Sequence, residues 1–390
     1  MTARQPLVFA AACIGMLFFG VALLSMGSLL PAIAGRFQLD SLASGALVSI
    51  LPFGVLAGSV IFGPIVDRFG YKLLLVVSAL VMIAGLEALA FAPSLGVLRL
   101  AMLAIGVGGG VLNGGTNALV ADISAGERGA RLSLLGVFFG LGALGMPVLL
   151  GALDGVAYAV ILSRIGAVLL LPVVYFAVIA FPVPKQAQGF PLAQGIGLLR
   201  DGGLLLIAAT LALQSGLEGV VNNWTTTYLE SGRGLGASQA LFALSAFVAG
   251  MVVARLALAG VLRRVAGDRV LFISMELSGI GIALILAAGA NAGLATAGFA
   301  VLGVGLAAGF PLLLGYVADL YPSITGTAFS VVLAIALLGN MGINYLVGVL
   351  SDVLGPGNLP LYLGVCLVLQ FGVAVAALRS FRRRIAATPA

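Results

Sequence analysis

Long apolar runs, separated by short polar turns, fill the chain from one end to the other. Each run is long enough to cross roughly 30 Å of hydrocarbon as an α-helix. Dividing the runs at Gly, Pro and charged residues predicts twelve transmembrane helices, and therefore an all-α membrane protein. The predicted helices cover residues 7–34, 42–66, 71–93, 95–121, 131–153, 157–182, 203–230, 237–262, 269–291, 293–319, 325–351 and 358–379.

The composition supports this interpretation. Of the 390 residues, 62% are hydrophobic and 8% are charged, and the mean hydropathy is +1.22. Soluble domains have about 25% charged residues, and a water-soluble fold of this length could not bury so much apolar surface. The lipid bilayer is therefore the expected surrounding. The two cysteines, Cys13 and Cys366, lie in apolar runs near opposite ends of the chain, so no disulfide framework is expected.

The basic residues indicate how the chain crosses the membrane. They are scattered among short loops rather than clustered with aromatic residues, which argues against nucleic-acid binding despite the net charge of +6. If both termini are cytoplasmic, 14 of the 19 basic residues lie on the cytoplasmic side, as the positive-inside rule requires. We therefore expect a multi-pass protein of the cell membrane, the inner membrane of a bacterium, with cytoplasmic termini. The 14 residues are Arg4, Arg68, Lys72, Arg128, Arg131, Lys185, Arg200, Arg263, Arg264, Arg269, Arg379, Arg382, Arg383 and Arg384.

An internal repeat with an offset of 197 residues is visible in the sequence. At this offset "GVG" at 106–108 meets "GVG" at 303–305. "VAD" at 120–122 meets "VAD" at 317–319 in the same register. Two tripeptide matches are hard to explain by composition, even with 56 glycines in the chain. The repeat predicts two pseudo-symmetric six-helix bundles.

The longest loop between two predicted spans, "PVPKQAQGFPLAQG", divides the chain six helices plus six. We expect an N-terminal six-helix bundle at residues 1–183 and a cytoplasmic linker at 184–200. The C-terminal six-helix bundle is expected at residues 201–390.

The turn between the second and third predicted helices reads "GPIVDRFGYK". It resembles the G-x-x-x-D-R-x-G-[RK]-[KR] signature of the major facilitator superfamily, which implies a twelve-helix transporter that works by alternating access. Gly63 lets two helices approach closely, and Gly70 permits a tight turn. Asp67, Arg68 and Lys72 are expected to form a charged latch that favours one conformation. The ordinary alternative is that any short cytoplasmic loop carries basic residues.

Three further stretches resemble the fucose permease-like, sugar-transporting branch of this superfamily. They are "GVGGGVLNGGTNALVAD", the Gly- and Pro-rich "FFGLGALGMP", and "GLEGVVNNWTTTYL" in the seventh helix. The resemblance implies that helices 1, 4, 7 and 10 line the substrate cavity. This chain departs from the proton-linked members, because its first helix has no acidic residue, Asn113 stands where the fourth helix would offer one, and the chain has no histidine.

Polar residues recur at helical spacing inside the seventh predicted helix. Gln214, Glu218, Asn222 and Thr225 would share one face, because residues three or four apart are neighbours on a helix. A polar group that has no hydrogen-bond partner in lipid costs about several kcal/mol, as for backbone groups. This stripe is therefore expected to face water or a ligand. Trp224 lies nearby, where it could stack on a sugar or belong to the interfacial aromatic belt.

Paired amides at the same spacing are predicted in two further helices. Amides both donate and accept hydrogen bonds, which suits a neutral polyhydroxylated solute. The alternative is that they only join helices through interhelical hydrogen bonds. The candidate substrate-binding residues are Gln214, Glu218, Asn222, Trp224, Thr225, Tyr228, Asn113, Asn117, Asn340 and Asn344.

Two carboxylates and one arginine lie within the predicted spans. Glu218 is the candidate for proton coupling, because it lies in the polar stripe near the middle of its helix. Glu87 lacks polar neighbours at Ile83 and Phe91, so a structural or interfacial role is expected for it. Arg255 could extend to the membrane surface, pair with a carboxylate or contact an anionic ligand.

These features predict a secondary active or facilitative transporter that moves a small polar solute, a sugar or polyol, by alternating access, with proton coupling left open. The alternatives are a proton antiporter for lipophilic drugs and a membrane sensor that transports nothing. No constellation for catalysis is apparent, so neither an enzyme, a metal site nor a cofactor is expected. The expected partners are the substrate, a proton in the coupled case, and the bilayer, and we expect a monomer.

Overall fold

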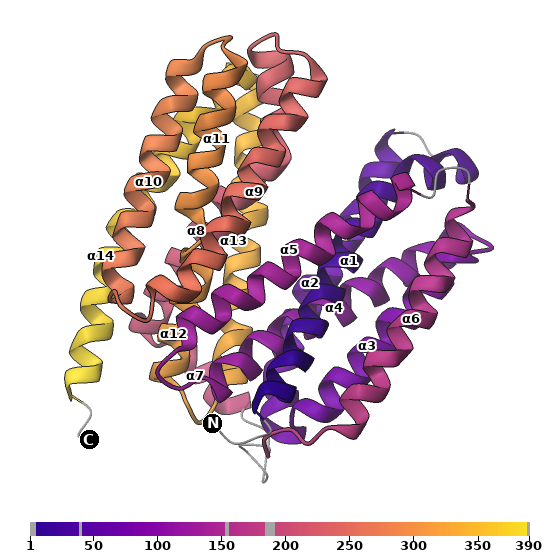
Figure 1. Ribbon diagram of the computed structural model, residues 1–390, viewed down its shortest axis with the longest axis vertical. Coiled ribbons are helices and arrows are strands. Elements are labelled where there is room, and N and C mark those ends of the chain that lie inside the picture. The colour runs from indigo at the N-terminus through magenta and orange to yellow at the C-terminus, as the bar shows by residue number, and fades with distance from the viewer. Residues whose placement is uncertain (1–4, 39–40, 153–155, 184–191, 388–390) are drawn as a thin grey trace. The chain divides into compact units, whose positions relative to one another are not determined.

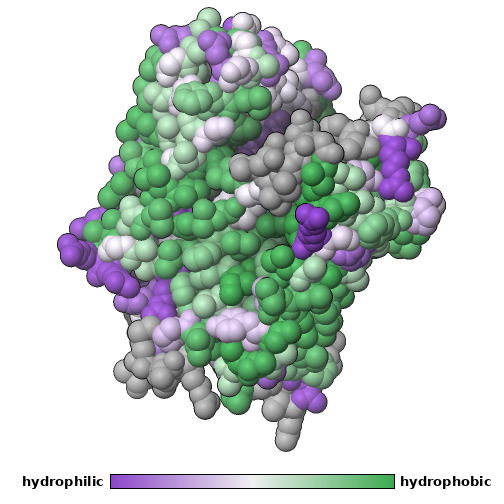
Figure 2. Space-filling view, turned by 45° about the vertical axis from the view of Figure 1, so that its right-hand side comes forward, coloured by the Kyte–Doolittle hydropathy of each residue, from purple (hydrophilic) through white to green (hydrophobic). Residues whose placement is uncertain are grey.

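The computed structural model describes residues 5–38, 41–152, 156–183 and 192–387. All elements in this part of the chain are helices (Figure 1). Eleven of the spans in the described residues are long and apolar enough to cross a membrane. On the face shown in Figure 2, hydrophobic residues cover most of the visible surface, and hydrophilic residues gather near its edges. The twelve-helix all-α membrane fold predicted from the apolar runs is therefore confirmed in class.

The helices of the first half follow the predicted spans closely. They are α1 (Gln5–Phe37), α2 (Ser41–Phe69), α3 (Tyr71–Ala90), α4 (Leu95–Ile123), α5 (Arg128–Ala152) and α6 (Tyr158–Val178). The expected linker at 184–200 contains a short helix, α7 (Leu192–Leu198), and its residues 184–191 lie outside the described residues.

The second half contains two irregular elements that the apolar pattern did not predict. A π-helix, η1, continues the seventh span, and the tenth span is divided into α11 and α12. The elements are α8 (Gly202–Thr227), η1 (Tyr228–Gly232), α9 (Ala237–Val261), α10 (Gly267–Ala288), α11 (Ala292–Leu306), α12 (Gly309–Leu320), α13 (Thr325–Leu354), η2 (Pro356–Asn358) and α14 (Leu359–Ala387).

Two compact units are present. The first comprises Met1–Ile123, Val137–Gly195 and Tyr321–Ser330. The second comprises Ser124–Gly136, Ile196–Leu320 and Val331–Ala390. In the first unit α4 packs against α1, α2 and α3, and in the second α11 packs against α9 and α10.

The sequence repeat is reflected in the helices. The helix α4 begins at Leu95 and α11 at Ala292, which is again an offset of 197 residues. Gly106 and Gly303, which the repeat equates, make the same kind of contact. A Cβ on Gly106 would overlap the carbonyl of Leu51 in α2, and one on Gly303 would overlap that of Phe247 in α9. Small residues at these two positions therefore allow the close helix packing of each unit.

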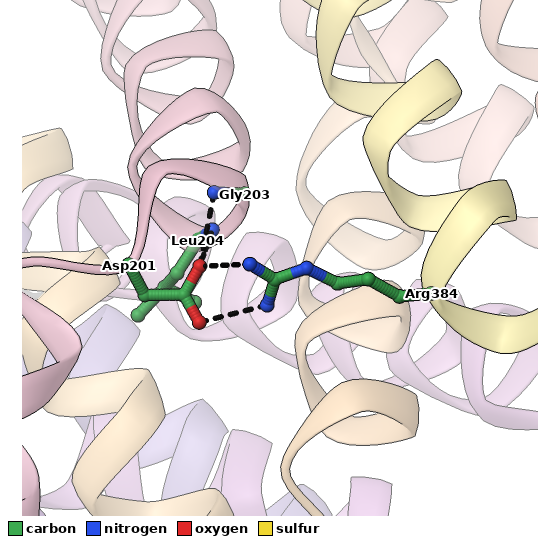
Figure 3. Close-up of polar contacts among 4 residues, drawn as sticks. All are labelled: Asp201, Gly203, Leu204 and Arg384. Atoms are coloured by element: carbon green, nitrogen blue, oxygen red, sulfur yellow. Dashed lines mark hydrogen bonds and ion pairs between the residues drawn. The ribbon is translucent and has the colours of Figure 1, made fainter. Parts of the chain in front are cut away.

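The start of α8 is held by a capped and ion-paired carboxylate (Figure 3). Asp201 Oδ1 accepts hydrogen bonds from the backbone N–H groups of Gly203 at 2.9 Å and Leu204 at 3.2 Å. Its two oxygens also accept from the Arg384 guanidinium near the end of α14, at 2.5 and 2.7 Å. The N-terminus of α8 and the last turns of α14 are thereby joined, as the packing of these two helices requires.

Candidate functional site

The turn of the "GPIVDRFGYK" motif is built on one left-handed glycine. The helix α2 ends at Phe69 and α3 begins at Tyr71, so Gly70 alone makes the turn, with φ at 83°. Its N–H donates to the Val66 carbonyl at 2.8 Å. A residue with a Cβ is strained at this φ, which explains the glycine.

Asp67 lies against the first turn of α13, within the first unit. It is 2% exposed, and its Oδ2 accepts from the Thr327 backbone N–H at 2.8 Å and from the Thr327 hydroxyl at 2.7 Å. Gly63 packs against the Gly326 backbone, where a Cβ would overlap the carbonyl oxygen. The Asp67 carboxylate therefore binds the N-terminus of α13, where the helix dipole favours a negative charge. Two further members of the expected latch are placed differently: the Arg68 guanidinium lies over the Phe69 ring, and Lys72 is exposed.

A buried amide connects three helices of the second unit. Gln214 in α8 is 2% exposed, and its Nε2 donates to Glu218 Oε1 and to the Leu306 carbonyl, both at 2.8 Å. Its Oε1 accepts from Nε2 of Gln370 in α14 at 2.7 Å. Gln370 is itself fully buried. Each hydrogen-bonding group of the Gln214 amide is thus used inside the protein.

The Leu306 carbonyl lies where the tenth span is interrupted. The predicted span at 293–319 is present as one membrane span, but it consists of two helices, because α11 ends at Leu306 and α12 begins at Gly309. Pro311 has no N–H for the carbonyl four residues earlier, and its ring crowds that position. Gly309 leaves the space that Gln214 fills, since a Cβ there would lie 2.4 Å from the Gln214 Cδ. A side-chain amide therefore satisfies backbone at the break, as in other discontinuous membrane helices.

Glu218 and Arg255 bring opposite charges into the same unit. Glu218 is partly buried and interacts electrostatically with Arg255 in α9. Arg255 is 9% exposed, and its Nη1 donates weakly to the Gly136 carbonyl at 3.5 Å. Ser133 in α5 donates to the Arg255 carbonyl at 2.9 Å. The Arg255 Nε has no hydrogen-bond partner among the described residues. No ion pair within 4.0 Å joins the Arg255 guanidinium to a carboxylate among the described residues, so the role of Arg255 stays a prediction.

Amides also line the contact between α8 and α13. Asn340 Nδ2 donates to the Ser215 carbonyl at 2.6 Å and to the Ser215 hydroxyl at 3.1 Å. Asn344 Nδ2 donates to Asn340 Oδ1 at 2.9 Å, and Asn344 Oδ1 accepts from Asn223 Nδ2 at 3.0 Å. Gly219 leaves room for both, because a Cβ there would lie 2.6 Å from each Asn side chain. This chain of amides joins two helices, as the alternative interpretation of the amide pairs requires.

The amide pair of α4 is bonded within its own helix. Asn117 is 8% exposed, and its Nδ2 donates to the Asn113 carbonyl at 2.8 Å and to Asn113 Oδ1 at 3.1 Å. Asn113 is partly buried. Both residues belong to the first unit.

The predicted stripe on α8 separates into exposed and buried residues. Asn222 is exposed, and its Nδ2 donates to the Glu218 carbonyl at 2.7 Å. Thr225 is fully buried and donates to the Val221 carbonyl at 2.6 Å. Tyr228 is also buried, and its hydroxyl accepts from Arg233 Nε at 3.0 Å. Thr225 in α8 and Tyr228 at the start of η1 thus belong to the packed interior, whereas Asn222 does not.

Trp224 packs beside the apolar core of the second unit. Its ring is 3.3 Å from the place that a Cβ on Gly348 in α13 would occupy. The partly buried indole therefore contacts protein on one side, and a role in ligand stacking stays a prediction.

Two polar contacts have no counterpart in the sequence reasoning. Gln370 was not considered, although it is an isolated amide in an apolar run, and that isolation is the signal that could have identified it. Glu87 lacks polar neighbours on its own helix, but it accepts a hydrogen bond from the Ser163 hydroxyl in α6. Among the described residues no group of three or more His, Cys, Asp or Glu could hold a metal ion.

Comparison with known proteins gives consistent matches. The family model of the Major Facilitator Superfamily matches residues 7–341. An uncharacterized transporter, y4wD of Sinorhizobium fredii (strain NBRC 101917 / NGR234), is 28% identical over 311 residues, which cover 76% of this chain and 79% of the relative. The galactose-proton symporter of Escherichia coli (strain K12) is 31% identical over 138 residues, which are 35% of this chain and 30% of the relative.

Solved structures share the fold. The transporter FucP in its outward conformation matches with a TM-score of 0.78 at 18% identity, covering 95% of this chain and 98% of FucP. The human organic anion transporter MFSD10 matches with a TM-score of 0.78 at 18% identity, covering 96% of this chain and all of that chain. At these identities the likeness concerns the fold alone. The family match, the multi-pass helices and the shared fold together show that this chain is a membrane transporter of the Major Facilitator Superfamily.

Proposed function

We propose that this protein is a secondary transporter that moves a small polar solute, a sugar or polyol, together with protons, and that Glu218 carries the proton. The observation that supports this most is the bonded chain of Gln214, Gln370, Glu218 and the Leu306 carbonyl inside a membrane-spanning unit. An ionisable group at such a place is costly and is typically retained for function.

The surroundings of Glu218 suit a group that gains and loses a proton. The carboxylate accepts a hydrogen bond from Gln214, and the positive charge of Arg255 in the same unit attracts it. Proton uptake by Glu218 removes this attraction. The same Gln214 amide also donates to the Leu306 carbonyl at the helix break. Glu218 is thus placed so that its protonation can affect the conformation of the second unit at this break.

The substrate class is inferred from the groups that remain accessible. Asn222 is exposed on α8 one turn after Glu218, and an amide of this kind donates to and accepts from hydroxyl groups. The match to the galactose-proton symporter of Escherichia coli supports a sugar, although it extends over only a third of this chain.

Uptake into proteoliposomes tests the proposal. With an imposed proton gradient, the wild type is expected to accumulate one member of a panel of sugars and polyols. Glu218→Gln is expected to abolish accumulation while leaving some exchange of substrate across the membrane. Glu87→Gln is the matched control, because it removes a second membrane carboxylate whose bond to Ser163 a glutamine can also make. Full accumulation by Glu218→Gln would contradict the coupling role.

A substrate with an anionic group is the second candidate, and the unpartnered Arg255 Nε is the observation that favours it. A buried guanidinium can bind a carboxylate in a fork-like geometry. A relative that matches 43% of this chain is the 4-hydroxybenzoate transporter PcaK of Pseudomonas aeruginosa. Uptake of an aromatic carboxylate that Arg255→Gln abolishes would favour this candidate over a sugar. Saturable efflux of lipophilic cations would instead indicate a drug antiporter, and no flux of any solute would indicate a sensor.

A further inference from the structure

The second copy of the Gly63–Lys72 turn differs from the first in one decisive position. The offset of 197 residues equates Gly63 with Gly260 and Asp67 with Arg264. The carboxylate that contacts the first turn of α13 in the first copy is thus replaced by a cation. Gly63 has no room for a Cβ, whereas one on Gly260 would meet nothing within 4 Å. The second copy therefore keeps the glycine without packing a helix against it.

The open position belongs to a hollow at the end of α9. Its volume is about 380 Å³. On the same side of the helix, Val253 and Leu256 are exposed, as expected for a surface that faces acyl chains. The lining of the hollow has an apolar part, which we call the floor, at Ala257, Gly260 and Val261, and a basic part, which we call the rim, at Arg263 and Arg264.

Positive charge at this rim is only partly balanced. Arg263 lies 3.4 Å from Glu127, but that carboxylate is shared with Arg131 at 3.5 Å. Arg264 is exposed and has no carboxylate within 4.0 Å among the described residues. The neighbouring Asp268 is engaged in an ion pair with Arg382. An anionic group at the rim would therefore meet an excess of positive charge.

We propose that this hollow binds one anionic phospholipid, with the phosphate at Arg263 and Arg264 and the upper part of an acyl chain on Ala257 and Gly260. The hollow lies where a membrane-spanning helix ends, which is the depth of the lipid headgroups, and clusters of basic residues at that depth attract anionic lipids. The apolar floor distinguishes a lipid from a free phosphate ion, which would need only the two arginines. The site is separate from Glu218 and does not depend on which solute is transported.

Native mass spectrometry of the full chain in detergent tests the proposal, with phosphatidylglycerol and phosphatidylcholine of the same acyl chains as probes. The wild type is expected to retain phosphatidylglycerol in preference. Arg264→Gln is expected to lower its retention about fivefold, the effect of one basic residue near a charged membrane surface. Gly260→Leu leaves the charge unchanged but fills the hollow in a direction that is open, so it should lower retention of the same lipid without disturbing the fold.

Arg383→Gln is the matched control, because Arg383 is exposed on α14 and does not line the hollow. It removes the same charge and is expected to lower retention less than twofold. Equal losses for Arg264→Gln and Arg383→Gln would overturn the proposal in favour of diffuse attraction. Unchanged retention in Gly260→Leu would also overturn it, as would displacement of the lipid by millimolar inorganic phosphate, which would indicate a simple anion site.

Discussion

Replacement of Gly309 by alanine adds a single carbon atom, Cβ, which should disrupt the hydrogen bonds of the buried Gln214 amide. The new Cβ would lie 2.4 Å from both Cδ and Oε1 of Gln214, a distance at which one side must move. Gln214 is fixed by Glu218, Gln370 and the Leu306 carbonyl, so it cannot move without losing hydrogen bonds. A lost bond to a charged group costs about 1.5–3 kcal/mol and overpacking costs about 1–3 kcal/mol. We expect Gly309→Ala to lower the free energy of unfolding by about 2–4 kcal/mol.

The chain contains one tryptophan, Trp224, which packs inside the second unit and reports its unfolding by fluorescence. Unfolding in mixed detergent and dodecyl sulfate micelles then gives the stability of each variant. Gly372→Ala is the matched control in α14, because a Cβ there meets nothing within 4 Å. It is expected to be neutral or stabilising by up to about 1 kcal/mol.

A double-mutant cycle separates the clash from a general effect of the substitution. The three atoms nearest to the new Cβ all belong to Gln214 beyond its own Cβ, so Gln214→Ala removes them. In that background Gly309→Ala should cost less than about 1 kcal/mol, since the partner of the clash is gone. Equal costs in both backgrounds, or equal stability of Gly309→Ala and Gly372→Ala, would refute this account of the helix break.

Three further predictions concern other contacts. Asp67→Asn should lower stability by about 1–3 kcal/mol, because a buried charged acceptor at the first turn of α13 is lost; thermal unfolding followed by circular dichroism measures this, and an unchanged midpoint would contradict it. Asp201→Ala should lower the free energy of unfolding by about 0.5–2 kcal/mol, because a helix cap is lost. Arg384→Ala should lower it by less than about 1 kcal/mol, since the arginine side chain is 41% exposed, and the reverse order in chemical unfolding would be inconsistent with capping. Asn222→Ala should weaken substrate binding by about 0.5–1.5 kcal/mol, whereas Asn117→Ala should leave it unchanged because the Asn117 amide is bonded within α4. Substrate affinities that calorimetry finds unchanged in both variants would assign both residues to helix packing.

The sequence was sufficient for the class of fold and for the turn at Gly70. Apolar runs of membrane length predict helices directly, because the bilayer leaves few other structures for the backbone. The left-handed conformation of Gly70 follows from the residue itself, since a helix ends one residue before it and another begins one residue after it. The contact that Asp67 makes could not be predicted from the sequence, because its hydrogen-bond partner, Thr327, lies 260 residues away along the chain.

The candidate site was predicted only in part, and the reason is geometric. Helical spacing on an ideal helix groups Thr225 with Gln214 and Glu218, but it does not say which neighbour covers each face. Packing against other helices buries Thr225 and Tyr228, and the π-helix that begins at Tyr228 changes the spacing there. Local spacing therefore identified the polar helix, while long-range packing decided which of its residues are accessible.

The interruption of the tenth span shows the same limit. Pro311 is a visible signal for a break, but twelve spans of membrane length already explained the apolar pattern. That the break is stabilised by Gln214 and supported by Gln370 depends on three helices meeting, which no spacing within one helix reveals.

Proton uptake on addition of substrate is the most direct measurement of the central claim, that Glu218 couples protons to transport. Proteoliposomes without an imposed gradient would contain a pH-sensitive dye, and the substrate found in the uptake panel would be added outside. We expect the lumen to acidify as substrate enters the wild type and the Glu87→Gln control, and to stay at constant pH in Glu218→Gln while substrate still equilibrates. Substrate-dependent acidification in Glu218→Gln, at the wild-type ratio of protons to substrate, would contradict the account.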